Sequence, residues 1–133
     1  MSPDTELQGE IVNLLRTSSE VTDWVGTRVY DAVPETAEFP YISLGPTITN
    51  SEEIECLDSM MILVQIDVWS REVGFPECKE IADVVRKTVR GLEELQINAL
   101  VRLDHSLTTT MRDPDGLTSH SVLMFNAMVE RVE

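Results

Sequence analysis

Basic residues are scarce in this sequence of 133 residues. Ten Lys and Arg stand against 24 Asp and Glu, which gives a formal net charge of −14. Duplex DNA is bound by clustered Lys and Arg, because these displace counterions from the phosphates. The sequence therefore disfavours a direct nucleic-acid binding function.

Cysteine, a leader segment and long apolar runs are scarce or missing too. Cys56 and Cys78 form no CxxC pair and have no histidine at ligand spacing, so neither a zinc site nor a disulfide framework is predicted. The first ten residues are acidic and polar, and the longest apolar run, Met60–Val64, is too short to span a bilayer. We expect a protein made in the cytoplasm that does not enter a membrane. Its length predicts one domain, residues 1–133.

Apolar residues at helical spacing predict two main helices and one short helical turn. The main helices are expected at Asp4–Arg16 and from Glu77 to about Leu92, where Pro76 suits the first turn. The short turn is expected at Ser19–Val25, with Trp24 and Val25 capping the core.

Strands are predicted between and after these helices. Residues 28–33 and 40–44 are β-prone, and residues 59–71 alternate clearly between apolar and polar positions. Residues 45–58 lack a period and carry Pro46 and four acidic residues, so a solvated loop is predicted there.

The last third of the sequence predicts a β-hairpin. Its turn holds Asp113, Pro114 and Gly116 at positions that a type I turn favours. The apolar residues of the two strands are expected to face each other: Val101, Leu103 and Leu107 opposite Leu123, Phe125, Ala127 and Val129. The fold class that follows is α+β, a mainly antiparallel sheet of about four strands with two main helices packed on one face.

Apolar side chains on the second face of this sheet would be poorly placed in a monomer. They are Leu63, Trp69, Met124 and Met128, and we expect them to make subunit contacts.

No residue pattern predicts catalysis. His105 and His120 fall on the facing strands of the predicted hairpin, but a third metal ligand is missing, so neither a metal nor a cofactor is expected. The carboxylate pairs Glu52 with Glu53 and Asp113 with Asp115 are expected in hydrophilic loops, where nothing separates their pKa values. Neither a GxSxG elbow nor a phosphate-binding glycine motif occurs. We expect a protein that is not an enzyme.

Blocks of residues spread over most of the chain resemble the phage tail completion family. The blocks are Val25–Pro34, Phe39–Gly45, Val64–Arg71, the helix with Lys79, Ile81, Ala82 and Val85, and the run Arg112–Gly116 with Thr118 and His120, leading into Phe125 and Val129. The sequence is similar to tail terminator, or tail-to-head joining, proteins of long-tailed phages and of gene transfer agents.

This resemblance implies a structural protein at the head-proximal end of a virion tail. It implies a hexameric ring that caps the tail tube, ends its polymerisation and joins the tube to a head–tail connector or stopper protein. DNA would pass through the ring without specific binding. The contact residues expected for the tube or connector lie in the two predicted loops: Asn50, Glu52, Glu53, Glu55, Arg112, Asp113 and Asp115.

An alternative from another class remains open. The same α+β domain could bind a small ligand or act in regulation, and could homodimerise through its sheet. That alternative predicts a defined pocket and a stable dimer, whereas the terminator reading predicts a ring.

Overall fold

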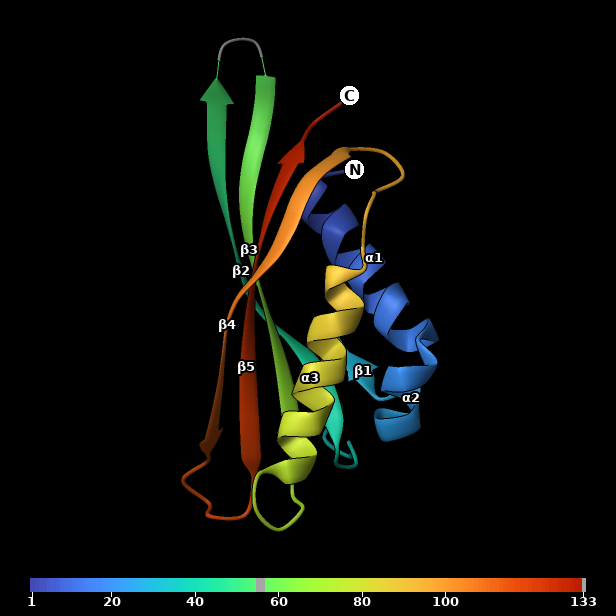
Figure 1. Cartoon of the computed structure of the whole chain (residues 1–133), viewed down its shortest axis with the longest axis vertical. Helices are drawn as coiled ribbons and strands as arrows, with labels where there is room; N and C mark the ends of the chain where they lie inside the picture. The colour runs from blue at the N-terminus through green and yellow to red at the C-terminus, as the bar shows by residue number, and fades with distance from the viewer. Residues whose placement is uncertain (55–56, 133) are drawn as a thin grey trace.

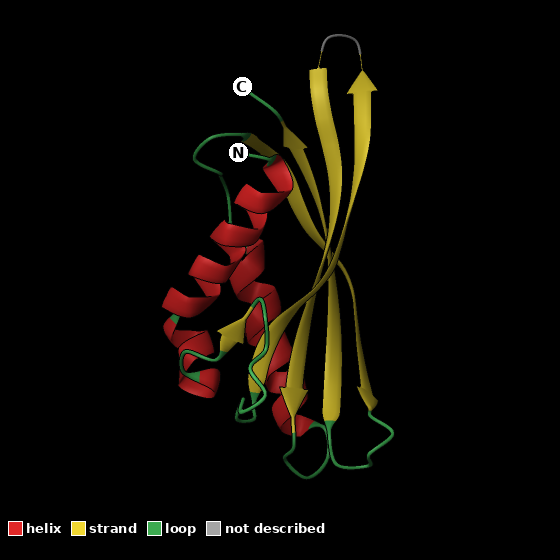
Figure 2. Cartoon of the chain, turned by 180° about the vertical axis from the view of Figure 1, so that it is seen from behind, coloured by secondary structure: helices red, strands yellow, loops and turns green. Residues whose placement is uncertain are grey.

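The fold is one mixed sheet with helices packed on one of its faces (Figures 1 and 2). It is seen in a computed structural model that describes residues 1–54 and 57–132. The helices are α1 (Pro3–Thr17), α2 (Ser19–Val25) and α3 (Pro76–Arg90); the strands are β1 (Val29–Tyr30), β2 (Tyr41–Ile54), β3 (Leu57–Ser70), β4 (Ala99–Arg112) and β5 (Ser119–Glu130). The strand order is β1-β2-β3-β5-β4. The predicted α+β class is confirmed, with five strands instead of about four.

The fifth strand is the short β1, which runs parallel to β2 and pairs only at Val29 with Ile42 and at Tyr30 with Ser43. The strand predicted over residues 28–33 is therefore mostly wrong, because only two of its residues pair. Two arginine side chains hold β1 in place. The Arg16 guanidinium, from α1, donates to the Val29 carbonyl oxygen, and the Nε of Arg28, the residue before β1, donates to the Pro40 carbonyl oxygen.

The solvated loop predicted at residues 45–58 is wrong over most of its length. Residues 45–54 continue strand β2 and pair antiparallel with β3 as far as Ile54 with Leu57. The register shifts between Leu44 and Thr47, so the ladder passes around Gly45 and Pro46, the latter having no N–H to donate. Figure 2 shows this β2–β3 hairpin extending beyond the helices. Strand residues exposed on both faces have no apolar alternation, which is why their sequence reads as a loop.

The core lies between the helices and the inner face of the sheet. The fully buried side chains from the helices include Leu7, Ile11, Leu15, Ile81, Val85 and Val89, and those from the sheet include Ile62, Ile66, Val68, Leu123, Phe125 and Val129. Val25 belongs to this core as predicted, but Trp24 is 38% exposed and does not cap it.

The predicted hairpin is confirmed as β4 and β5, joined by a turn in which the Gly116 N–H donates to the Asp113 carbonyl oxygen. The predicted facing of its apolar residues is partly wrong. Register shifts at Val101 and Ser106 leave Leu103 opposite Ala127 but move Leu107 opposite Met124, on the other face. Each bulge inserts one residue, and one residue reverses the face to which the following side chains point.

Glu6 joins α1 to the segment before β4. Its side chain is buried and accepts hydrogen bonds from the backbone N–H of Ile97 (2.6 Å), the backbone N–H of Asn98 (2.9 Å) and the Asn98 side-chain amide (3.1 Å). Burial raises the pKa of a carboxyl group, but these donors outweigh burial and hold the pKa of Glu6 below its ordinary value. The carboxylate replaces water for three donors that the fold takes out of solvent.

Candidate functional site

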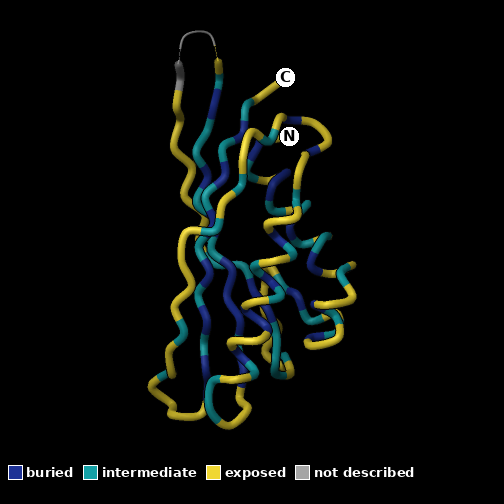
Figure 3. Tube along the Cα trace, in the orientation of Figure 1, coloured by how far each residue is buried: buried dark blue, intermediate teal, exposed yellow. Residues whose placement is uncertain are grey.

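The face of the sheet that points away from the helices, here called the open face, carries half-buried apolar side chains. It holds the alternating residues of the two central strands: Met61, Leu63, Gln65, Asp67 and Trp69 of β3, and His120, Val122, Met124, Asn126 and Met128 of β5. Figure 3 shows these strands as a mixture of buried and intermediate positions. All four residues expected to make subunit contacts, Leu63, Trp69, Met124 and Met128, lie on it.

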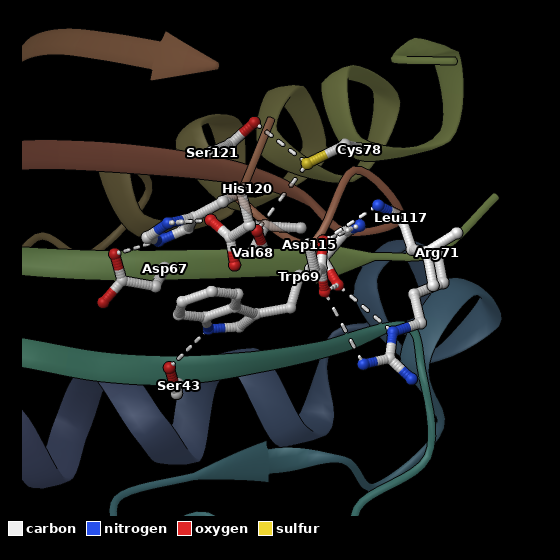
Figure 4. A network of polar contacts seen from close by, with 12 residues as sticks. Ser43, Asp67, Val68, Trp69, Arg71, Cys78, Asp115, Leu117, His120 and Ser121 are labelled. Carbon is white, nitrogen blue, oxygen red and sulfur yellow. Dashed lines mark hydrogen bonds and ion pairs between the residues drawn. The ribbon is translucent and has the colours of Figure 1, made fainter. Parts of the chain in front are cut away.

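A row of aromatic rings crosses one end of the open face. Ring centroids are 5.8 Å apart for Tyr30 and Tyr41, and 6.2 Å apart for Tyr41 and Trp69. The Trp69 indole stacks on the His120 imidazole at 3.6 Å and 13°. Its Nε1–H donates to the Ser43 hydroxyl at 2.9 Å, as Figure 4 shows. Trp69 is thus held in one orientation by neighbours on both sides.

Asp67 lies two residues before Trp69 on β3 and holds the His120 ring in place. Its Oδ1 atom accepts hydrogen bonds from His120 Nε2 at 2.9 Å and from Gln65 Nε2 at 3.0 Å (Figure 4 shows the first). Gly45 of β2 packs directly on these groups, since a Cβ atom there would lie 2.7 Å from Gln65 Nε2 and 2.8 Å from Asp67 Oδ2. Sequence reasoning missed this cluster, because its members come from three strands and no local pattern links them.

The two histidines lie on opposite faces of the sheet, so they do not form the cross-strand pair that the hairpin allowed. His105 pairs in register with Phe125 on the helix-covered face, and His120 pairs with Met111 on the open face. Within residues 1–54 and 57–132, no group of three or more His, Cys, Asp or Glu side chains is arranged to hold a metal ion.

The turn at Arg112–Gly116 is rigidly built. The Asp115 carboxylate accepts hydrogen bonds from the Thr118 hydroxyl and from the backbone N–H groups of Thr118 and Leu117. These donors hold the pKa of Asp115 below its ordinary value, and the Arg71 guanidinium lies 3.9 Å from the Asp115 carboxylate.

The other two predicted contact residues of this turn also contact neighbouring side chains. The Oδ1 atom of Asp113 lies 3.8 Å from His120 Nδ1, and the Arg112 guanidinium lies 4.8 Å from the Phe75 ring centroid. The predicted contact residues of this turn therefore gather at one end of the sheet.

The other predicted contact residues lie in the β2–β3 hairpin. Asn50 and Glu52 are exposed strand residues of β2, opposite Met61 and Ser59 of β3. Glu53 pairs with Asp58 near the end of the hairpin. Glu55 lies outside the described residues, and so does Cys56.

An open groove of about 480 Å³ separates α3 from β4. Its polar lining comprises Lys79, Asp83 and Arg86 from the helix and His105, Thr108 and Thr110 from the strand. Burial, followed by the charge of Arg86, lowers the pKa of His105. The groove lies beside the outermost strand of the sheet, and its two basic side chains outnumber its one acidic side chain in a chain whose overall charge is strongly negative.

Buried Cys78 has the environment of a structural thiol. Its Sγ atom lies 3.1 Å from the Ser121 hydroxyl, and burial raises its pKa. A raised thiol pKa lowers the thiolate fraction and with it the nucleophilicity. In the part of the chain that the structure describes, no helix combines the length and apolar character needed to cross a membrane.

Solved structures and a family model are similar to this chain over most of its length. A chain in the solved virion of a native gene transfer agent particle matches with a TM-score of 0.88 and 28% identity, over 96% of this chain and 96% of that chain. The bacteriophage SPP1 gp17 protein matches with a TM-score of 0.59 over 92% of this chain and 88% of its own, and at 18% identity this likeness concerns the fold alone. The comparison with curated proteins found no match. The family model of tail completion protein gp17 matches residues 9–130. The chain therefore belongs to the tail completion protein gp17 family of structural phage tail proteins, the family that its sequence blocks resemble.

Proposed function

We propose that this tail protein forms a hexameric ring that caps the tail tube, ends its polymerisation and joins the tube to a head–tail connector or stopper protein. The observation that carries the proposal is the open face. Its apolar side chains are half-buried and, within the described residues, no helix lies over them. Surfaces of this kind are typical of contacts between protein subunits.

Leu63, Trp69, Met124 and Met128 are the side chains that we propose for contacts between subunits. A ring needs a heterologous contact, in which two different surfaces of the same chain meet, and the ring closes when the rotation per subunit fits. Trp69 is already oriented by Ser43 and His120, so little side-chain freedom is lost when a neighbour packs against it.

The two ends of the sheet are the proposed axial contacts. At one end, Arg112, Asp113 and Asp115 lie in or beside a turn that is exposed and internally hydrogen-bonded. At the other end lies the β2–β3 hairpin, near Glu53. Asn50 and Glu52 lie along an edge of strand β2 and not in a loop, and for them we propose a lateral contact with a neighbouring subunit.

The net charge supports the passage of DNA through such a ring. A formal charge of −14 on each subunit repels phosphate groups, so DNA would not adhere to the wall of the opening. The charge also favours a free protein that stays soluble until a tube end is available.

The test is to assemble tube protein in the presence and absence of this chain and to measure tube lengths by electron microscopy. We expect a limited length distribution with a ring at one end. Leu63→Lys on the open face should abolish the effect, whereas Val73→Lys, at a loop position that is 90% exposed, should retain it. Unlimited growth with the wild-type chain would refute the proposal. A stable dimer that ignores tube protein would favour the ligand-binding alternative.

A further inference from the structure

The sheet has two free edges of opposite character. Among the described residues, β4 is the last strand on one side of the sheet and pairs only with β5. On the other side, β1 covers only Ile42 and Ser43 of β2, so β2 has no described neighbour beyond β3 from Thr47 onward. Free edges present unpaired N–H and C=O groups that can pair with another strand. We propose that the β4 edge of one copy pairs with the β2 edge of the next copy, so that the sheet continues between subunits. This interface rests on the ring proposed above, and in it Leu63 and Met124 of the open face flank the paired edges, beside Ile48 and Leu107.

The strand directions allow this pairing. β2 is antiparallel to β3, β3 to β5 and β5 to β4, so β2 and β4 run in opposite directions within one copy. When two copies stand side by side in the same orientation, as in a ring, β4 of one copy and β2 of the next are therefore antiparallel. The contact is heterologous, as ring closure requires.

The side chains also match in register. The open-face residues of β4 opposite Met124, Asn126 and Met128 are Leu107, Asp104 and Arg102. The residues of β2 that share this face are Ile48, Asn50 and Glu52, opposite Leu63, Met61 and Ser59. An antiparallel pairing that places Ile48 beside Leu107 then places Asn50 beside Asp104 and Glu52 beside Arg102.

Each of these three pairs is chemically complementary. Ile48 and Leu107 are 55% and 50% exposed, which is high for large apolar side chains, and they would cover each other next to Met124. The Asn50 amide can donate to the Asp104 carboxylate, and Glu52 and Arg102 carry opposite charges. Within one copy the Arg102 Nε atom lies 3.6 Å from Asp104 Oδ2, so Glu52 of the next copy would join an exposed ion pair already present on β4. The bulge at Ser106 supplies the one-residue offset that brings all three pairs into line.

The charge around the two edges favours the same partner. Beside β4 lies the groove in which Lys79 and Arg86 outnumber the one acid, Asp83, whereas the β2 edge carries Glu52 and lies near Asp4, whose carboxylate accepts a hydrogen bond from the Thr49 hydroxyl. Copies with a formal charge of −14 repel one another at long range. Local pairing of a basic edge with an acidic edge offsets that repulsion and fixes the orientation.

Cysteine cross-linking tests the register. In a Cys56→Ser background, one chain carries Ile48→Cys and a second carries Leu107→Cys, and the two are mixed with tube protein under mild oxidation. We expect a disulfide-linked dimer from the mixture and none from either chain alone. A chain with both substitutions should give a ladder of multimers. Ile48 and Leu107 of one copy are separated by three strand spacings, about 14 Å, which is beyond disulfide reach, so every cross-link joins two copies.

A charge exchange gives an independent readout. Glu52→Arg and Arg102→Glu should each weaken assembly, measured as mass by light scattering in the presence of tube protein, by roughly tenfold. The double variant should recover most of the loss, which a purely structural role of either residue would not produce.

The outcomes separate this inference from the proposed function. If the chains assemble with tube protein but residues 48 and 107 do not cross-link, the edge pairing is wrong and the ring stands. If Leu107→Cys is shielded from a maleimide only when tube protein is added, and no cross-link forms, the β4 edge belongs to the tube protein and the pairing is again wrong. If no multimer forms under any condition, the proposed ring falls, and the interface falls with it.

Discussion

Removing the Glu6 carboxylate should destabilise the whole domain, although Glu6 lies in the first turns of a surface helix. Glu6→Ala leaves the Ile97 N–H, the Asn98 N–H and the Asn98 amide without their acceptor. A buried donor left without an acceptor costs about 1–3 kcal/mol. Because part of the site can take up water, we expect a loss of about 3–5 kcal/mol, a large share of the stability of a small domain.

Urea unfolding followed by circular dichroism measures this loss. Glu6→Gln should lose less than Glu6→Ala, because its amide oxygen still accepts one or two of the hydrogen bonds. The exposed Glu80→Gln on α3 is the matched control, with a change within about 0.5 kcal/mol. A loss below about 1 kcal/mol for Glu6→Ala would refute the role assigned to the carboxylate.

The stabilisation that the Glu6 carboxylate provides should depend on pH. The pKa of Glu6 is lowered from its ordinary value of 4.5 in the folded state. A carboxyl group whose pKa is lowered in the folded state binds a proton more readily in the unfolded state. The contribution of Glu6 to the free energy of unfolding is therefore complete above about pH 5, and it is lost as the pH falls through the folded pKa. The difference in stability between wild type and Glu6→Gln should therefore shrink on acidification below 4.5, and a difference that grows there would contradict the assignment.

Two further predictions concern packing. Gly45→Ala should destabilise the protein by about 1–2 kcal/mol, because the added Cβ must displace the Gln65 side chain; the control Gly9→Ala, with nothing within 4 Å, should be neutral or stabilising in the same urea titration. In a Cys56→Ser background, the Cys78 thiol should react with a chromogenic disulfide reagent only as fast as the protein unfolds, since it is buried beside Ser121 and its pKa is raised. Rapid labelling in native buffer would contradict that burial.

The elements with one buried face could be predicted from the sequence. β3 alternates because Ile62, Val64, Ile66 and Val68 are buried while their neighbours lie on the open face, and α3 shows a helical stripe for the same reason. The outer half of β2 could not be predicted, because residues 46–52 are exposed on both faces and have no period. Strand identity there comes from pairing with β3, a long-range contact that local composition does not encode.

The candidate site was predicted in part. The four residues expected on the second face, Leu63 among them, do lie on the open face, because alternation along β3 and β5 assigns faces directly. The Gly45 contact with Asp67 and the position of Leu107 were not predicted. Both depend on bulges, and a bulge has no signature in the hydrophobic pattern. Glu6 was missed because an acid in the first turn of a helix is common for electrostatic reasons alone.

The β2–β3 hairpin beyond the helices has a consequence for hydrogen exchange. Residues 46–52 of β2 are exposed, while the strands beside α3 contain fully buried side chains. Opening a segment costs free energy in proportion to the buried surface that it exposes, so amides of this hairpin should exchange at free energies well below that of global unfolding. The chain thus combines a body that resists opening with a projecting segment that can change its hydrogen-bond partners while the body stays folded.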